Sequence, residues 1–126
     1  MDLENNLREI QKSFYEYDLT DSIIEKLYFD NGLVNFNMLV DYYFTEKDEE
    51  HIELTFEDCT KVNYEIPPEI YKMNTGILNF SHFTIIKTVV TERDNQVWIK
   101  IFTINSETEF LNILCKNVKF KSVTKL

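Results

Sequence analysis

The chain has 126 residues, of which 44% are hydrophobic and 14% aromatic, and its formal net charge is -9. This apolar share excludes a disordered acidic chain, and the length fits one domain with one core, which we place over residues 1–126. No segment approaches the roughly 20 uninterrupted apolar residues of a membrane span, and the acidic start differs from a secretory signal. We therefore expect a cytoplasmic protein without a membrane partner.

The first predicted element is an amphipathic helix over about residues 3–16. Leu3, Leu7, Ile10, Phe14 and Tyr17 follow one another at alternating steps of four and three residues, which places them on one stripe. Packing of this stripe on the core is favoured over contact with a partner.

Residues 20–62 are predicted to form a first three-stranded meander, because the apolar period changes to two. The inward positions are Ile23, Leu27 and Phe29, then Val34, Phe36, Met38 and Val40, then Ile52, Leu54 and Phe56. Asp30-Asn31-Gly32 offers positive-φ positions for a tight hairpin turn between the first two runs. An acidic loop over residues 45–50 precedes the third run, where His51 is expected to be solvated.

Residues 63–80 are predicted to connect two meanders. Pro67 and Pro68 cannot donate backbone hydrogen bonds and therefore interrupt the sheet, and a short helical turn would follow and end near Gly76. The segment is too short and too apolar for a flexible tether between domains.

Residues 81–123 are predicted to form the second meander. Its first run has two possible inward faces, Phe83 with Ile85 and Val89 or Ile86 with Val90, and it leads to a turn at Arg93-Asp94-Asn95. The inward positions that follow are Val97, Ile99 and Ile101, then Leu111, Ile113 and Cys115. Trp98 is out of phase with its neighbours and is expected on the opposite face. A last run over residues 118–122 carries Lys119 and Lys121, which suit a solvated edge strand.

Together these elements predict a mainly β fold. We expect an antiparallel six- to seven-stranded sandwich or partly open barrel, built from two three-stranded meanders, with an N-terminal α-helix. Residues 52–59 can be laid on residues 111–118 at an offset of 59, and the two hairpins match at about 60 to 64. This repetition indicates an internal duplication.

The sequence has no pattern that indicates a catalytic or metal site. The two histidines, His51 and His82, are in neither an HExxH nor a CxxH motif, and the two glycines exclude GxSxG and phosphate-binding loops. Cys59 and Cys115 are expected to be buried, reduced thiols without a disulfide. We therefore predict no catalytic residues, no metal and no cofactor.

The charges favour binding to a protein and not to nucleic acid. Residues 1–66 hold 17 acids and 5 bases, whereas residues 67–126 hold 5 acids and 8 bases. Such an acidic surface repels nucleic acid and steers basic proteins. The predicted partner-binding residues are the acids Glu46, Asp48, Glu49, Glu50, Glu53, Glu57 and Asp58, with the aromatic residues Tyr42, Tyr43 and Trp98.

Three phrases of this sequence, residues 21–28, 52–59 and 111–124, resemble the fiftieth numbered family of bacterial polymorphic-toxin immunity proteins. The family tends to place a histidine before the aspartate at the start of the first phrase, where this chain has Thr20 before Asp21. The resemblance implies a stoichiometric inhibitor that covers the active site of a secreted toxin.

Two functions follow as hypotheses. The first is a non-catalytic binding protein, in particular an immunity protein, whose acidic half docks a basic toxin domain. The alternative is a β-barrel or β-sandwich with a pocket for a small molecule, with Cys115 or His82 at its mouth.

Overall fold

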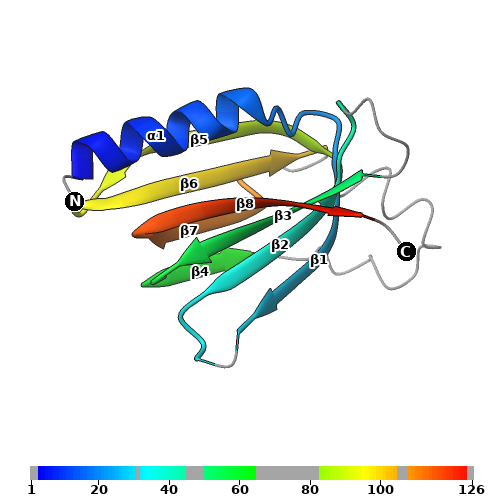
Figure 1. Ribbon diagram of the computed structural model, residues 1–126. Coiled ribbons are helices and arrows are strands. Elements are labelled where there is room, and N and C mark those ends of the chain that lie inside the picture. The colour runs from blue at the N-terminus through cyan, green and yellow to red at the C-terminus, as the bar shows by residue number, and fades with distance from the viewer. Residues whose placement is uncertain (1–2, 31, 45–49, 65–82, 105–107, 125–126) are drawn as a thin grey trace.

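The computed structural model describes residues 3–30, 32–44, 50–64, 83–104 and 108–124. In chain order the elements are α1 (Leu3–Glu16), β1 (Ile23–Phe29), β2 (Phe36–Asp41), β3 (Glu50–Glu57), β4 (Lys61–Tyr64), β5 (Ile85–Arg93), β6 (Gln96–Thr103), β7 (Leu111–Cys115) and β8 (Asn117–Thr124). The predicted mainly β class and the N-terminal helix are confirmed (Figure 1). The described residues form eight strands, more than the six or seven expected. The predicted connector turn at residues 67–76 lies outside the described residues.

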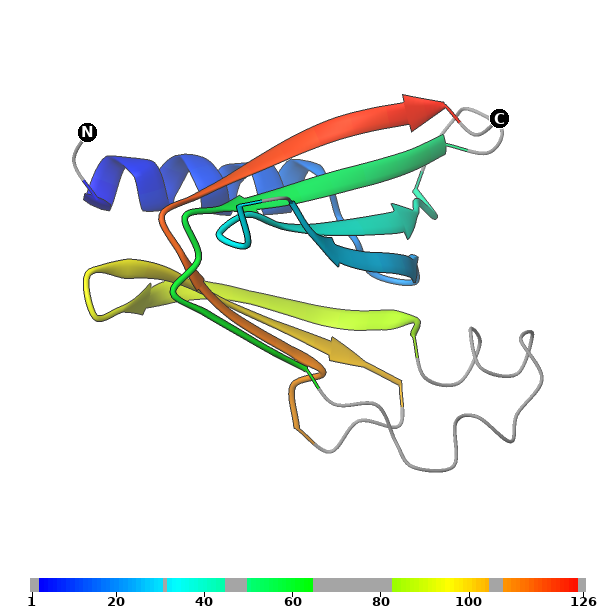
Figure 2. The ribbon, with the colours of Figure 1, turned by 90° about the horizontal axis from the view of Figure 1, so that it is seen from below.

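The strands form two antiparallel four-stranded sheets. Sheet A has the order β1-β2-β3-β8 and sheet B the order β4-β7-β6-β5. Figure 2 shows them as two layers, with the chain passing between the layers at one corner. Each predicted meander is present, and each is completed by the last strand of the other half: β8 pairs with β3, and β4 pairs with β7.

The corner is a bent two-stranded ladder. Lys116 N donates to Glu57 O at 2.9 Å on the side of sheet A, and Thr60 N donates to Leu114 O at 2.9 Å on the side of sheet B. Asp58, at the bend, has a φ of 54°, a left-handed conformation that aspartate tolerates better than most residues. The backbone hydrogen bonds therefore continue from one sheet into the other.

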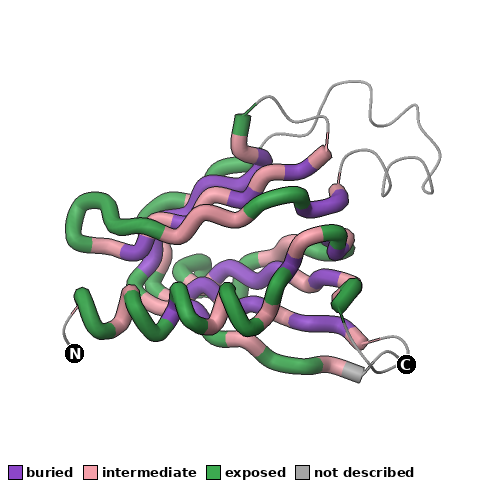
Figure 3. The backbone as a smooth tube through the Cα atoms, turned by 90° about the horizontal axis from the view of Figure 1, so that it is seen from above, coloured by how far each residue is buried: buried purple, intermediate pink, exposed green. Residues whose placement is uncertain are grey.

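Helix α1 packs against β5 and β8, which are edge strands of the two sheets. Its predicted stripe faces the core: Ile10 is buried, and the rings of Phe14 and Tyr17 lie 4.9 and 5.1 Å from that of Phe120 on β8. Gln11 Nε2 also donates to Val90 O on β5 at 2.8 Å. Figure 3 shows the resulting exposed outer side of the helix.

Buried apolar side chains fill the space between the sheets. The largest are Phe36, Phe56, Met38, Ile52, Leu54, Ile85, Ile99, Ile101, Leu111 and Ile113, each less than 2% exposed. They come from inward positions of both meanders, as the period of two predicts. Burial of a side chain of this kind stabilises the fold by roughly 1.5–3 kcal/mol.

Irregularities in β1 and β5 change the predicted inward faces. In β1 the register shifts between Ile24 and Lys26, so the buried residue at the start of the strand is Ile24 and not Ile23. In β5 it shifts between Ile85 and Lys87. Ile85 is buried and Val90 packs on the core, so each proposed face of this run holds for one part of the strand. A bulge reverses the alternation, and a strict period of two cannot anticipate it.

One hairpin turn was predicted correctly and the other was not. Arg93 pairs with Gln96, and Asp94 and Asn95 both have positive φ, as a two-residue turn requires. By contrast, Phe29 pairs with Phe36, which leaves a six-residue connection instead of the predicted tight turn. In that connection Leu33 has a φ of 61°, whereas Gly32 does not have a positive φ.

The two halves share details of their geometry. Both register shifts lie at the same place, since Ile24 and Ile85 are 61 residues apart. The starts of β1 and β5 meet at a bridge between Ile23 and Thr84, also 61 residues apart. A transverse row of paired residues crosses sheet A as Phe29, Phe36, Phe56 and Val118, and a matching row crosses sheet B as Val90, Ile99, Ile113 and Val62. In these rows β3 and β7 correspond at 57 positions, not at the 59 suggested by the sequence.

Candidate functional site

The predicted acidic residues on β3 lie along the outer face of sheet A, where neighbouring side chains engage them. Glu53 accepts a hydrogen bond from the hydroxyl of Tyr28 at 2.8 Å. Glu57 is paired with Lys119 at 3.2 Å and accepts from Asn117 at 2.9 Å. Their charges are therefore partly compensated within the sheet. Glu46, Asp48 and Glu49 lie outside the described residues.

Two further predicted acids flank this row. Glu50, at the start of β3, accepts a hydrogen bond from Ser122 Oγ at 2.5 Å. Asp58 is exposed at the corner between the sheets. The hydrogen bond to Glu53 raises the pKa of Tyr28 to about 12, because the neighbouring carboxylate disfavours the charged phenolate.

His51 is buried, contrary to the expectation of a solvated strand start. Only 6% of it is exposed, and its Nε2 contacts the carboxylate of Glu25 on β1. The bulge in β1 lies at Glu25, so the side chain that meets His51 comes from an irregular position. A buried polar group needs such a partner, and periodicity gives no signal of it.

The predicted aromatic anchors do not lie on one surface. Tyr42 is half-buried, with its ring 6.1 Å from that of Tyr17 on the α1 side, whereas Tyr43 is 63% exposed. Phe44, which sequence reasoning did not select, is 50% exposed and contacts the ring of Tyr43. Trp98 lies on the outer face of sheet B, apart from the acidic row of sheet A.

Both cysteines are free in the structure. Burial raises the pKa of the Cys59 thiol to about 11 and raises that of the Cys115 thiol further above its usual range. Both thiols therefore stay protonated near neutral pH, which makes them poor nucleophiles. His82, the other residue named for a pocket mouth, lies outside the described residues.

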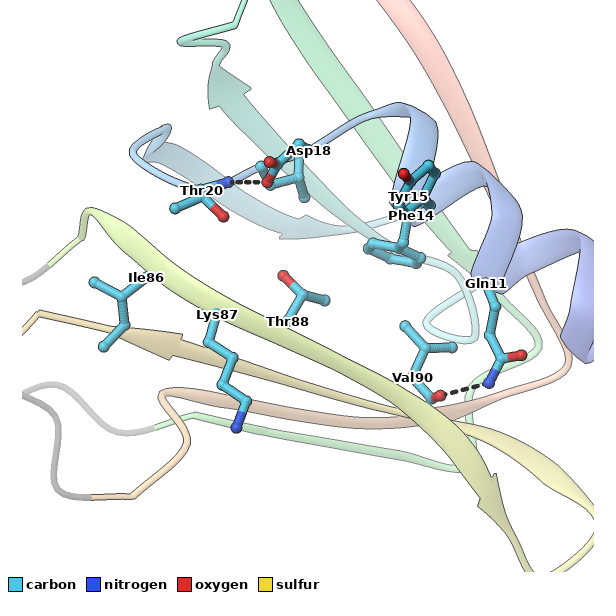
Figure 4. A pocket seen from close by; sticks show the side chains of 10 residues that line it. Gln11, Phe14, Tyr15, Asp18, Thr20, Ile86, Lys87, Thr88 and Val90 are labelled. Atoms are coloured by element: carbon cyan, nitrogen blue, oxygen red, sulfur yellow. Dashed lines mark hydrogen bonds between the residues drawn. The ribbon is translucent and has the colours of Figure 1, made fainter.

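A groove of about 400 Å³ lies between α1 and β5, and sequence reasoning did not find it (Figure 4). Its lining is Gln11, Phe14, Tyr15, Asp18, Leu19, Thr20, Ile86, Lys87, Thr88 and Val90. Thr88 and Val90 point toward the helix in Figure 4, whereas Lys87 points away from it. Residues 60 or more positions apart form the groove, so no local pattern could reveal it.

The groove combines apolar walls with an acidic end. Phe14 and Val90 form part of the wall, and Tyr15 and Ile86 remain 86% and 48% exposed at its rim. Asp18 lies at one end, where its Oδ1 accepts a hydrogen bond from Thr20 N at 3.0 Å. That bond orients the carboxylate and leaves its other oxygen available to a ligand.

Comparison with known proteins gives no relative: no family profile and no curated protein matches this chain. Within the described residues, no group of three or more His, Cys, Asp or Glu side chains could hold a metal ion. The described part of the chain also contains no helix with the length and apolar character needed to cross a membrane.

Proposed function

We propose that this protein is a non-catalytic binding protein whose partner is another polypeptide. The observation that carries the proposal is the groove between α1 and β5, where exposed Tyr15 and Ile86 border an apolar hollow at the edge of a sheet. Large exposed apolar side chains around a hollow are typical of protein–protein contacts. The filled space between the sheets supports binding at this surface over a small-molecule pocket inside the fold.

The chemistry of the groove favours a long basic side chain of the partner. An arginine or lysine would lay its aliphatic stem against Phe14 and Leu19 and place its cation beside Asp18. Asp21 and Glu16, both exposed, lie close in sequence to that end of the groove and would add to the attraction. The acidic N-terminal half would speed the approach of such a partner.

The particular role that we propose is that of an immunity protein that neutralises a cognate bacterial toxin by covering its active site. The resemblance of three sequence phrases to that class supports this role, as does the surplus of acids in residues 1–66. A stoichiometric inhibitor needs a stable surface and no reacting groups, in agreement with two protonated, buried thiols.

We also propose that the two halves arose by internal duplication. The shared bulges of β1 and β5 and the matching transverse rows support this origin. So does the bridge at Ile23 and Thr84, where Ile24 N donates to Phe83 O and Ile85 N donates to Ser22 O. These two bonds exchange places when each residue is replaced by its counterpart 61 positions away.

The test of the binding proposal is calorimetric titration with the toxin-like protein encoded beside this chain. Ile86→Ala and Asp18→Asn should each weaken binding by about tenfold, because each removes one anchor of the groove. Val34→Ala is a matched control, since Val34 is also 48% exposed but lies in the β1–β2 connection.

Asp58→Asn distinguishes the groove from the acidic row of sheet A. If Asp58→Asn weakens binding while Asp18→Asn does not, the contact lies at the corner after β3 and not at the groove. Charge reversal at Glu49 and Glu50 tests the steering: it should slow association, and binding that is insensitive to salt would contradict an electrostatic approach. A neighbouring gene product that does not bind would count against the immunity role.

A further inference from the structure

The outer face of sheet B gathers cations in a chain whose net charge is -9. Val97, Ile99 and Ile101 of β6 are buried, so Trp98, Lys100 and Phe102 face outward between and beyond them. Lys87 is paired with Phe102, and Arg93 with Gln96, across β5 and β6. On the other side of the sheet, Lys61 of β4 is paired with Leu114, the neighbour of Trp98 on β7.

We call this surface the basic face and define it by Lys61, Lys87, Arg93, Lys100, Trp98 and Phe102. Its cations lie over its aromatic rings. Lys100 Nζ is 4.3 Å from the centroid of the Trp98 ring and Arg93 Cζ is 4.9 Å from it. Lys87 Nζ is 5.8 Å from the centroid of Phe102. Such contacts hold the cationic heads close to the sheet without neutralising them.

The tryptophan at the centre is fixed from below. Its Nε1 donates to Asn112 Oδ1 at 2.7 Å, and Asn112 Nδ2 donates to Glu109 Oε1 at 2.9 Å. Asn112 is only 7% exposed, so this relay is part of the sheet. The hydrogen bond from Asn112 lowers the pKa of Glu109, and the charges of Lys100 and Lys61 act in the same direction. Glu109 and Asp94, which lies 3.7 Å from Arg93, therefore offset only part of the four positive charges.

We propose that the basic face binds an acidic segment of a partner polypeptide, at a surface separate from the α1–β5 groove. Carboxylates of such a segment would pair with Lys87, Arg93 and Lys100, whose positions the rings of Trp98 and Phe102 already restrict. Pre-positioned side chains lose less conformational freedom on binding. The segment is extended, because the paired cations follow the flat surface of a sheet.

A single-stranded nucleic acid is the other anionic chain that such a face could attract, and the geometry favours it less. Nucleic acids bind sheets of this kind by stacking bases on free aromatic faces. Here Lys100 and Arg93 already lie over Trp98, and a base would have to displace them. The net charge of -9 adds repulsion against a long polyanion.

Trp98 makes the test direct, because it is the only tryptophan in the sequence and its fluorescence reports on the basic face. The full chain is titrated at low salt with a synthetic peptide of glutamate and glycine, and separately with an oligothymidylate. The peptide should change Trp98 fluorescence saturably, and added salt should reverse the change. A stronger response to the oligothymidylate, or no response to either probe, would overturn the proposal.

The paired variants Lys87→Glu with Lys100→Glu should weaken peptide binding by at least about tenfold. The matched control is Lys12→Glu with Lys121→Glu, two exposed lysines of α1 and β8 whose replacement changes the net charge by the same amount. Equal weakening in both double variants would show that only net charge matters and would refute a site on sheet B. Because neither pair touches Asp18 or Ile86, failure here would leave the groove proposal standing.

Discussion

The imidazole of His51 on β3 contacts the carboxylate of Glu25 on β1, across the strand β2 that separates them in sheet A. His51 is 6% exposed, so the contact removes a polar ring from water and supplies it with a partner. The pair joins the acidic outer face of sheet A to the bulge of β1. It also shows that the acidic half uses some of its charge within the fold.

Glu25→Ala should lower the free energy of unfolding by about 1–3 kcal/mol, because it leaves the buried His51 ring without its hydrogen-bond partner. The measurement is the midpoint of unfolding in guanidinium chloride. Glu92→Ala, at an exposed position near the end of β5, is the control and should change stability by less than about 0.5 kcal/mol. Equal losses in the two variants would mean that the His51 contact contributes nothing.

Leu33→Gly should stabilise the protein by about 1 kcal/mol. Leu33 has a φ of 61° and its side chain is 72% exposed, so the residue strains the backbone and contributes little packing. Asn95→Gly should stabilise by less, because asparagine tolerates its φ of 61° better than leucine does. Thermal and denaturant unfolding measure both; a loss of stability in Leu33→Gly would indicate that its side chain makes contacts that the strain argument omits.

Two isoleucines of sheet B should respond very differently to truncation. Ile99→Ala removes a fully buried side chain and should cost about 2–5 kcal/mol, whereas Ile86→Ala removes one that is 48% exposed and should cost less than about 1 kcal/mol. Unfolding midpoints of the two variants give the comparison. The small cost at Ile86 also makes that variant suitable for the binding test.

Stability should fall as the pH rises above about 9. The pKa of Cys59 is raised from its usual 9.0 to about 11, so between these values the unfolded chain has lost a proton that the folded chain retains. Unfolding is then favoured, and the stability linked to the thiol is lost through pH 11. Tyr28, raised from 10.0 to about 12, extends the decline. Tyr28→Phe should reduce the slope above pH 10, measured by denaturant unfolding at each pH; an unchanged slope would contradict this assignment.

Much of the fold could be predicted from the sequence because each element carries its own period. The stripe of α1 and the alternation in β6, including the outward position of Trp98, are local signals that tertiary structure did not override. The bulge at Glu25 and the positive φ of Leu33 could not be predicted, since both break the pattern for one residue. The strand β4 is only four residues long and was missed.

The binding surfaces were harder to predict, because they depend on which strands become neighbours. Alternation shows that Lys100 faces outward, but it does not show that Lys61 joins the same surface through β7. The groove between α1 and β5 arises in the same way, from helix packing on a distant edge strand. The acidic loop stood out in the sequence because its charges are contiguous.

The exchange of last strands between the halves makes each half depend on the other. A chain severed between Tyr64 and Phe83 would yield one piece holding β4, which completes sheet B, and another holding β8, which completes sheet A. Neither piece could satisfy its own unpaired backbone, so the two would reassemble into the intact architecture. The protein is thus suited to use as a split reporter whose signal depends on the meeting of two fragments.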